Sequence, residues 1–295
     1  MLRHVQASAI HPEASLPRLR PAFPEMLTAT FSLLVAHGAI GMLMAAALAR
    51  SPTGPGFHRL TLLVSLAGLT LGFGLRIASR SSPLPPLGSV ATVSFLLTLV
   101  AAVACGVRLL LAPARQHFGL LALAAIAGTV AVVSEPALRQ WLPSTGGLAA
   151  GLYFIGLATV APALGSVLFA MLLAHWYLVE PRLPLQPLQK VLWLFAGTEI
   201  LKGLLLFGLL FVHLPEWSTS EGGLVSAFVM GDALFVAVRA VLGVLAPLGL
   251  AWMIWKTVQI RSIQSATGIL YAALVFVLFG ETISIYLSLA TGQPY

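Results

Sequence analysis

Residues 191–213 read VLWLFAGTEILKGLLLFGLLFVH, and this stretch decides the fold. It is apolar over most of its length, with Glu199 and Lys202 close to its centre. At a rise of about 1.5 Å per residue, a helix of this length spans the roughly 30 Å hydrocarbon core of a bilayer. The stretch therefore predicts a transmembrane helix that holds two charged side chains near the middle of the membrane.

Further apolar stretches of similar length lie on both sides of this one, separated by connections rich in Pro and Gly. They predict an all-α integral membrane protein, a polytopic bundle of about eight transmembrane helices. The expected helices cover residues 27–49, 60–79, 87–111, 117–135, 148–178, 191–213, 226–255 and 267–291. The predicted organisation is a polar N-terminal tail (1–26), a single transmembrane bundle (27–291) and a short C-terminal tail (292–295).

The composition supports a membrane protein. Of 295 residues, 59% are hydrophobic and only 8% are charged, whereas soluble domains are about a quarter charged. The net charge of +7 comes from basic residues scattered between the apolar stretches, which is typical of membrane orientation and not of nucleic-acid binding. The expected partner is therefore the lipid bilayer and no nucleic acid. The distribution predicts a multi-pass protein of a bacterial-type inner (plasma) membrane with both termini on the non-cytoplasmic side.

Ionisable residues recur near the centres of the last three predicted helices. Glu199 and Lys202 are three residues apart and share one helix face, while Arg239 and Glu281 lie near the centres of 226–255 and 267–291. Asp232 precedes Arg239 by two turns, on the same face. A charged group at this depth costs at least about 2.5–3.5 kcal/mol, so such groups normally pair inside the bundle. These five residues predict either a proton path or a buried ion-pair network.

Two groups of residues are candidates for binding a cofactor. His37 lies near the centre of 27–49, and His175 is followed by Trp176 and Tyr177 near the end of 148–178. Both histidines are candidate ligands of a b-type haem, although His37 is about 9 Å deeper than His175 and one haem would not easily bridge them. A pair of His175 with His58 or His117 is geometrically easier. The His175–Tyr177 segment also suits a quinone headgroup, which needs hydrogen-bond partners and an aromatic wall.

Three functions remain open from the sequence. The first is a membrane-integral subunit of a respiratory or photosynthetic electron-transfer complex, at most the membrane subunit of a quinone-linked oxidoreductase, whose partner subunits would contact the N-terminal tail and the loop 214–223. The second is a proton-coupled secondary transporter, in which Lys202 and Arg239 hold a small anionic solute and Glu199 or Glu281 carries the proton. The third is a structural or assembly subunit in which the charges only fix the helix packing. We expect the first, because the predicted loops are too short to carry soluble chemistry.

Overall fold

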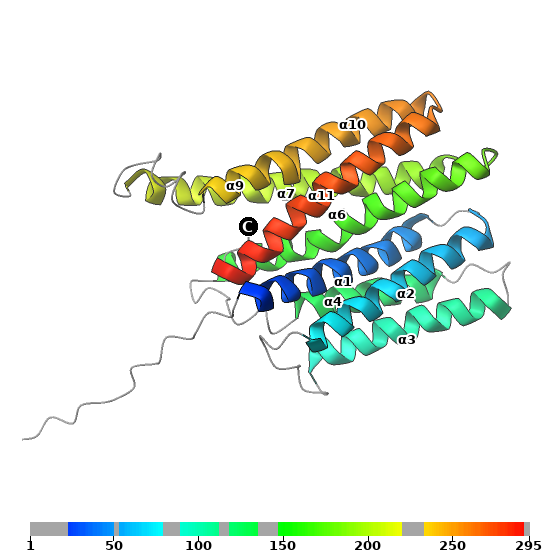
Figure 1. Ribbon diagram of the computed structural model, residues 1–295, viewed down its shortest axis with the longest axis horizontal. Coiled ribbons are helices and arrows are strands. Elements are labelled where there is room, and N and C mark those ends of the chain that lie inside the picture. Colours follow the sequence, from blue (N-terminus) through cyan, green and yellow to red (C-terminus); the bar gives the residue numbers. More distant parts are fainter. Residues whose placement is uncertain are drawn as a thin grey trace, which may run out of the picture.

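The computed structural model describes residues 23–49, 53–78, 89–111, 118–134, 147–219 and 233–291, and in these residues all regular structure is helical (Figure 1). The helices are α1 (Phe23–Ala49), α2 (Pro55–Ala78), α3 (Val90–Leu111), α4 (Phe118–Val133), α6 (Gly147–Val179), α7 (Gln186–Thr219), α9 (Ala233–Ala240), η1 (Val241–Leu245), α10 (Ala246–Gln259) and α11 (Ile263–Thr291). The segments α9, η1 and α10 follow one another without a break, and η1 is a turn of π-helix.

Within the described residues, seven helices are long and apolar enough to cross a membrane. The prediction of an all-helical protein is therefore confirmed for the described residues, and the length and composition of these seven helices indicate a multi-pass membrane protein. The predicted number of about eight is not confirmed, because α4 has 16 residues and is shorter than the roughly 20 residues that a bilayer requires.

Three helices begin four or five residues before the approximate starts of the predicted spans, for a common reason. Helix α1 begins at Phe23 and not at 27, α2 at Pro55 and not at 60, and α7 at Gln186 and not at 191. Each of these first turns contains a proline, and a proline is tolerated there because the first N–H groups of a helix have no partner within it. Hydropathy alone places the start at the first continuous apolar run, which comes one turn later.

The remaining boundaries differ from the predictions at their ends. Helix α7 continues to Thr219, beyond the predicted end at 213, and α10 continues to Gln259, beyond 255. Helices α3, α4, α6 and α11 begin or end within four residues of the predicted positions. The predicted tails 1–26 and 292–295 lie outside the described residues, except that residues 23–26 belong to α1. The predicted helix start at 226 also lies outside the described residues.

The helices lie side by side along one direction, and α6 lies between α7 and α1 (Figure 1). Helix α1 also contacts α2, α4 and α11, whereas α10 packs on α11 and α3 packs on α4. Both α1 and α6 are largely buried, and the apolar side chains of α2, α3 and α10 are more exposed. The core is therefore the α1–α6 pair, and the other helices surround it.

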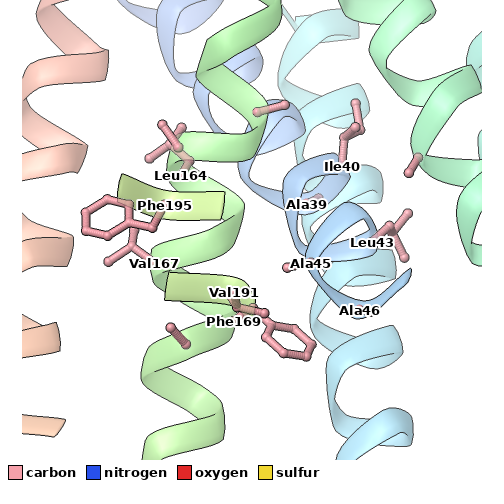
Figure 2. Close-up of a cluster of buried hydrophobic side chains, with 14 of the residues drawn as sticks. Ala39, Ile40, Leu43, Ala45, Ala46, Leu164, Val167, Phe169, Val191 and Phe195 are labelled. Carbon is pink, nitrogen blue, oxygen red and sulfur yellow. The ribbon is translucent and has the colours of Figure 1, made fainter. Parts of the chain in front are cut away.

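The core combines small and large side chains on both α1 and α6. Figure 2 shows Ala45 and Ala46 of α1 together with larger side chains of α1, α6 and α7, including Ile40, Phe169 and Phe195. Gly41 and Gly165 sit where α1 and α6 cross, and a Cβ atom on Gly41 would overlap the carbonyl oxygen of Ala161. Small residues allow backbones to approach closely in a membrane, where helices associate by packing and not by exclusion from water.

The variant Gly165→Ala is expected to destabilise the bundle, because its methyl group would occupy the position of the Gly41 backbone. Overpacking of this kind costs about 1–3 kcal/mol and more where backbone atoms must move. Thermal unfolding of the purified protein in detergent measures the effect as a lower Tm. Gly106→Ala in α3 is the control, since no atom lies within 4 Å of a Cβ there. Equal Tm values for the two variants would contradict the close crossing.

Candidate functional site

Lys202 of α7 lies between two glutamates. Its Nζ is 3.2 Å from both carboxylate oxygens of Glu199, one turn earlier on the same helix, and it forms a second ion pair with Oε1 of Glu281 on α11. The side chains of all three residues are almost fully buried. Charged groups in such surroundings are stable only when they are paired and hydrogen-bonded, and here one cation joins two acids from two helices.

The π-helical turn η1 brings a backbone carbonyl to the same cation. The oxygen of Gly243 is 3.5 Å from Lys202 Nζ, at the limit of a hydrogen bond. Gly243 also packs directly on Gly280, where a Cβ on Gly243 would lie 2.9 Å from the Gly280 Cα. This close crossing of η1 and α11 lets the adjacent Glu281 reach α7. Single π-turns inside helices are frequent at functional sites.

Arg239, near the end of α9, completes a group that we call the charge cluster: Glu199, Lys202, Arg239 and Glu281. It is 7% exposed and interacts electrostatically with both glutamates. The salt bridges among the described residues do not include it. With two acids and two bases, the charge cluster is formally neutral.

The charge cluster lies in the middle part of the bundle. Lys202 is at the midpoint of α7, between Gln186 and Thr219. Val277 is the middle residue of α11, and Glu281 follows it by one turn, about 6 Å. The cluster is therefore several helical turns from either end of these two helices, where water is scarce and electrostatic interactions are strong.

His37, in the middle of α1, is fully buried and has one fixed hydrogen bond. Its Nδ1–H donates to the carbonyl oxygen of Leu33 at 2.7 Å, so in the neutral ring Nε2 carries the free lone pair. Among the described residues, neither His37 Nε2 nor Glu281 Oε2 has a hydrogen-bond partner, although both atoms are buried. The two groups also interact electrostatically. His37 thus extends the polar interior from the charge cluster to α1.

The structure does not make one converging site of His175, Trp176 and Tyr177. His175 is exposed, whereas the Tyr177 hydroxyl is buried and donates to the Pro184 carbonyl at 2.7 Å. Trp176 packs on the Phe57 ring of α2, with ring centroids 5.9 Å apart, and its buried Nε1–H has no partner within the described part of the chain. The hydrogen-bond partners predicted for a quinone were His175 and Tyr177, and in the structure the buried group of this segment that lacks a partner is instead the indole N–H of Trp176.

The other predicted residues are distributed as follows. His58 is buried and lies with its Nε2 3.2 Å from Thr53 Oγ1, at the same end of the bundle as Trp176. His117 and Asp232 lie outside the described residues. The predicted continuation of the polar path through Asp232 therefore stays a prediction.

The sequence did not predict the contacts between helices that connect the residues of the charge cluster. Glu199 and Lys202 were expected to pair within their helix, and they do, but the ion pair between Lys202 and Glu281 and the contact with the Gly243 carbonyl depend on helix crossing. Gly280, next to Glu281, was the available signal, because glycine allows two backbones to meet. Cys105 is buried among apolar residues of α3 and takes no part.

In the part of the chain that the structure describes, no group of three or more His, Cys, Asp or Glu side chains is placed to hold a metal ion. No protein-family model, curated protein or solved structure matches the chain. The most specific chemical feature of the molecule is therefore the charge cluster itself, a neutral set of four ionisable side chains buried among three helical segments.

Proposed function

We propose that this protein is a proton-coupled secondary transporter of a small monovalent anion, acting in a bacterial-type inner membrane. One observation carries the proposal: Lys202, at the midpoint of α7, joins Glu199 of its own helix to Glu281 of α11, with Arg239 beside them. Transporters place substrate and coupling-ion sites near the middle of the membrane, at the meeting point of helices with irregular backbone. Here η1 supplies that irregular backbone.

The charge balance of the cluster gives a reason for coupling. With two acids and two bases it is neutral, and protonation of one glutamate leaves a net charge of +1. An uncompensated charge in a dry interior is strongly unfavourable. A monovalent anion that binds together with the proton restores neutrality, so each ligand favours the binding of the other. The same reasoning predicts that one proton and one anion move together without net charge.

The contacts of the four residues suggest which of them carries the proton and which bind the anion. Glu281 is the proton-carrying group, because its Oε2 has no hydrogen-bond partner among the described residues, whereas both oxygens of Glu199 are bound to Lys202. When Glu281 takes up a proton, its ion pair with Lys202 weakens and Glu199 holds the ammonium in place. Lys202 and Arg239 then provide the positive charge that binds the anion.

Liposomes that contain this chain alone test the proposal. An entrapped pH-sensitive dye records internal acidification when an inward gradient of nitrate or chloride is applied. We expect at least one of these anions to drive proton entry above the rate in protein-free liposomes. Rates equal to those of protein-free liposomes for both anions would contradict the proposal.

A second candidate is a membrane subunit of an electron-transfer complex that binds a quinone and a b-type haem, with other subunits as partners. The buried indole N–H of Trp176, beside the Phe57 ring at the end of the bundle, favours it. An N–H donor next to an aromatic wall suits a quinone carbonyl. His175 and His37 remain the proposed haem ligands, and a dithionite-reduced minus oxidised spectrum with a sharp b-type band would support them.

Trp176→Phe is the variant that tests the quinone site. It keeps the aromatic wall and removes the donor, so the affinity for a soluble short-chain ubiquinone analogue should fall about five- to tenfold, as expected for one hydrogen bond of about 1 kcal/mol. Equilibrium binding to the purified protein measures this. Trp252→Phe, at a side chain that is 64% exposed, is the matched control. Equal affinities, or no binding by the unsubstituted protein, would exclude this site.

A further inference from the structure

We infer that His37 of α1 exchanges the proton carried by Glu281, so that the proton path of this protein crosses from α11 to α1. The inference rests on the proposed function, since it names the residue that receives the transported proton. The transfer breaks the Oε2–H bond of Glu281 and forms an Nε2–H bond on His37, leaving a carboxylate and an imidazolium. Bound water between the two groups would carry the proton, and no electron is exchanged.

The tautomer of His37 favours this role. Because Nδ1–H donates to the Leu33 carbonyl at 2.7 Å, Nε2 of the neutral ring is a base with a free lone pair. That nitrogen is buried, and none of the described residues hydrogen-bonds to it. A buried polar atom without a partner is unfavourable by about 1–3 kcal/mol, so its presence calls for an explanation, and a role in catalysis or proton transfer is one such explanation.

The direction of the two side chains reduces the distance between them along the bundle. Phe23, at the start of α1, stacks edge-on against Tyr286, near the end of α11, with ring centroids 6.3 Å apart. The two helices are therefore antiparallel, and His37 is farther from this end of the bundle than Glu281. Side chains lean toward the N-terminus of their own helix. The His37 side chain therefore points along the bundle axis toward Glu281, and the Glu281 side chain points along the same axis toward His37.

Other charged groups near His37 are few. Helix α4 contains no Asp, Glu, Lys, Arg or His, and the ionisable groups of α2 and α6 lie at their ends. Helix α11 contributes Glu281 and α7 contributes Glu199 and Lys202, and both helices contact α1. Glu281 is the acidic group that acts on His37 electrostatically, whereas both oxygens of Glu199 are bound to Lys202. Of the acids in the described part of the chain, Glu281 is the one placed to exchange a proton with His37.

His37→Asn tests the inference, because asparagine can keep a donor for the Leu33 carbonyl and removes the Nε2 base. In the liposome assay, anion-driven proton entry should fall at least about tenfold, while Ser166→Ala, a neutral buried residue of α6, should keep the rate of the unsubstituted protein. Full activity of His37→Asn, with activity lost in Glu281→Gln, would overturn the inference and leave the proposed function standing. If His37→Asn does not fold, His37→Gln takes its place.

An infrared measurement tests the same inference without transport. The carboxylic C=O band that disappears in Glu281→Gln belongs to protonated Glu281, and it should shift in the His37 variant because the proposed exchange partner of that proton is lost. A band at the same frequency in both proteins, or no band that depends on Glu281, would overturn the inference. If no anion drives proton entry in the unsubstituted protein, the proposed function fails and this band alone decides whether His37 exchanges the proton.

Discussion

Lys202→Met is expected to lower the free energy of unfolding by about 3–5 kcal/mol, because it leaves two buried carboxylates without their cation. Lys202 is the residue that pairs with both Glu199 and Glu281, and its side chain is 2% exposed. Unfolding of the detergent-solubilised protein in increasing fractions of a denaturing detergent measures the loss. Lys190→Met, at an exposed cation at the start of the same helix, is the matched control and should change stability by less than about 0.5 kcal/mol.

A rescue variant shows whether the loss of stability in Lys202→Met comes from unpaired charges or from poorer packing. Glu199→Leu combined with Lys202→Leu would restore stability if these two residues formed an isolated pair, but in this structure it leaves Glu281 unpaired. Stability should return only when Glu281→Leu and Arg239→Leu are both added, since a buried ionic set replaced completely by apolar residues is often neutral or stabilising. Rescue by the double variant alone would show that Glu281 is not part of the cluster. A stable quadruple variant without transport would show that the cluster is functional.

Glu281→Gln is expected to abolish anion-driven proton entry, reducing it to the rate of protein-free liposomes. Glutamine keeps the shape of the side chain but cannot carry a proton, and it weakens the bond to Lys202 from an ion pair to a hydrogen bond. Retained transport in this variant would contradict the role of Glu281 as proton carrier.

Glu180→Gln is the matched control for this experiment. Glu180 is an exposed glutamate directly after α6, so the same chemical change is made outside the bundle interior. We expect its proton entry to equal that of the unsubstituted protein. A loss in both variants would mean that the assay responds to total charge and not to the cluster.

The sequence predicted the helical membrane fold because apolar length is a direct property of the chain. Residues 191–213 already required a spanning helix with two charges inside. Helix starts were predicted less well, since the turns that begin with Pro24, Pro55 and Pro187 are too polar to be recognised by hydropathy alone. The predicted count of about eight spans is not confirmed, because α4 is apolar but has only 16 residues in the described part of the chain.

The charge cluster was predicted residue by residue but not as an assembly. The spacing of Glu199 and Lys202 gives their contact directly, because residues three apart meet on a helix. The approach of Glu281 depends on the crossing at Gly243 and Gly280 and on the π-helical turn η1, and neither has a spacing rule in the sequence. His37 was singled out for its depth and considered as a haem ligand, and its electrostatic interaction with Glu281 could not be foreseen because it acts between the first helix and the last.

The central claim is that a proton and a monovalent anion enter the neutral charge cluster together. The most direct measurement is the rate of nitrate- or chloride-driven proton entry into liposomes with and without an imposed potassium diffusion potential. The unsubstituted protein is expected to drive proton entry at a rate that does not change with the potential, because the transported pair carries no net charge. A rate that rises or falls with the potential, or no driven entry at all, would contradict it.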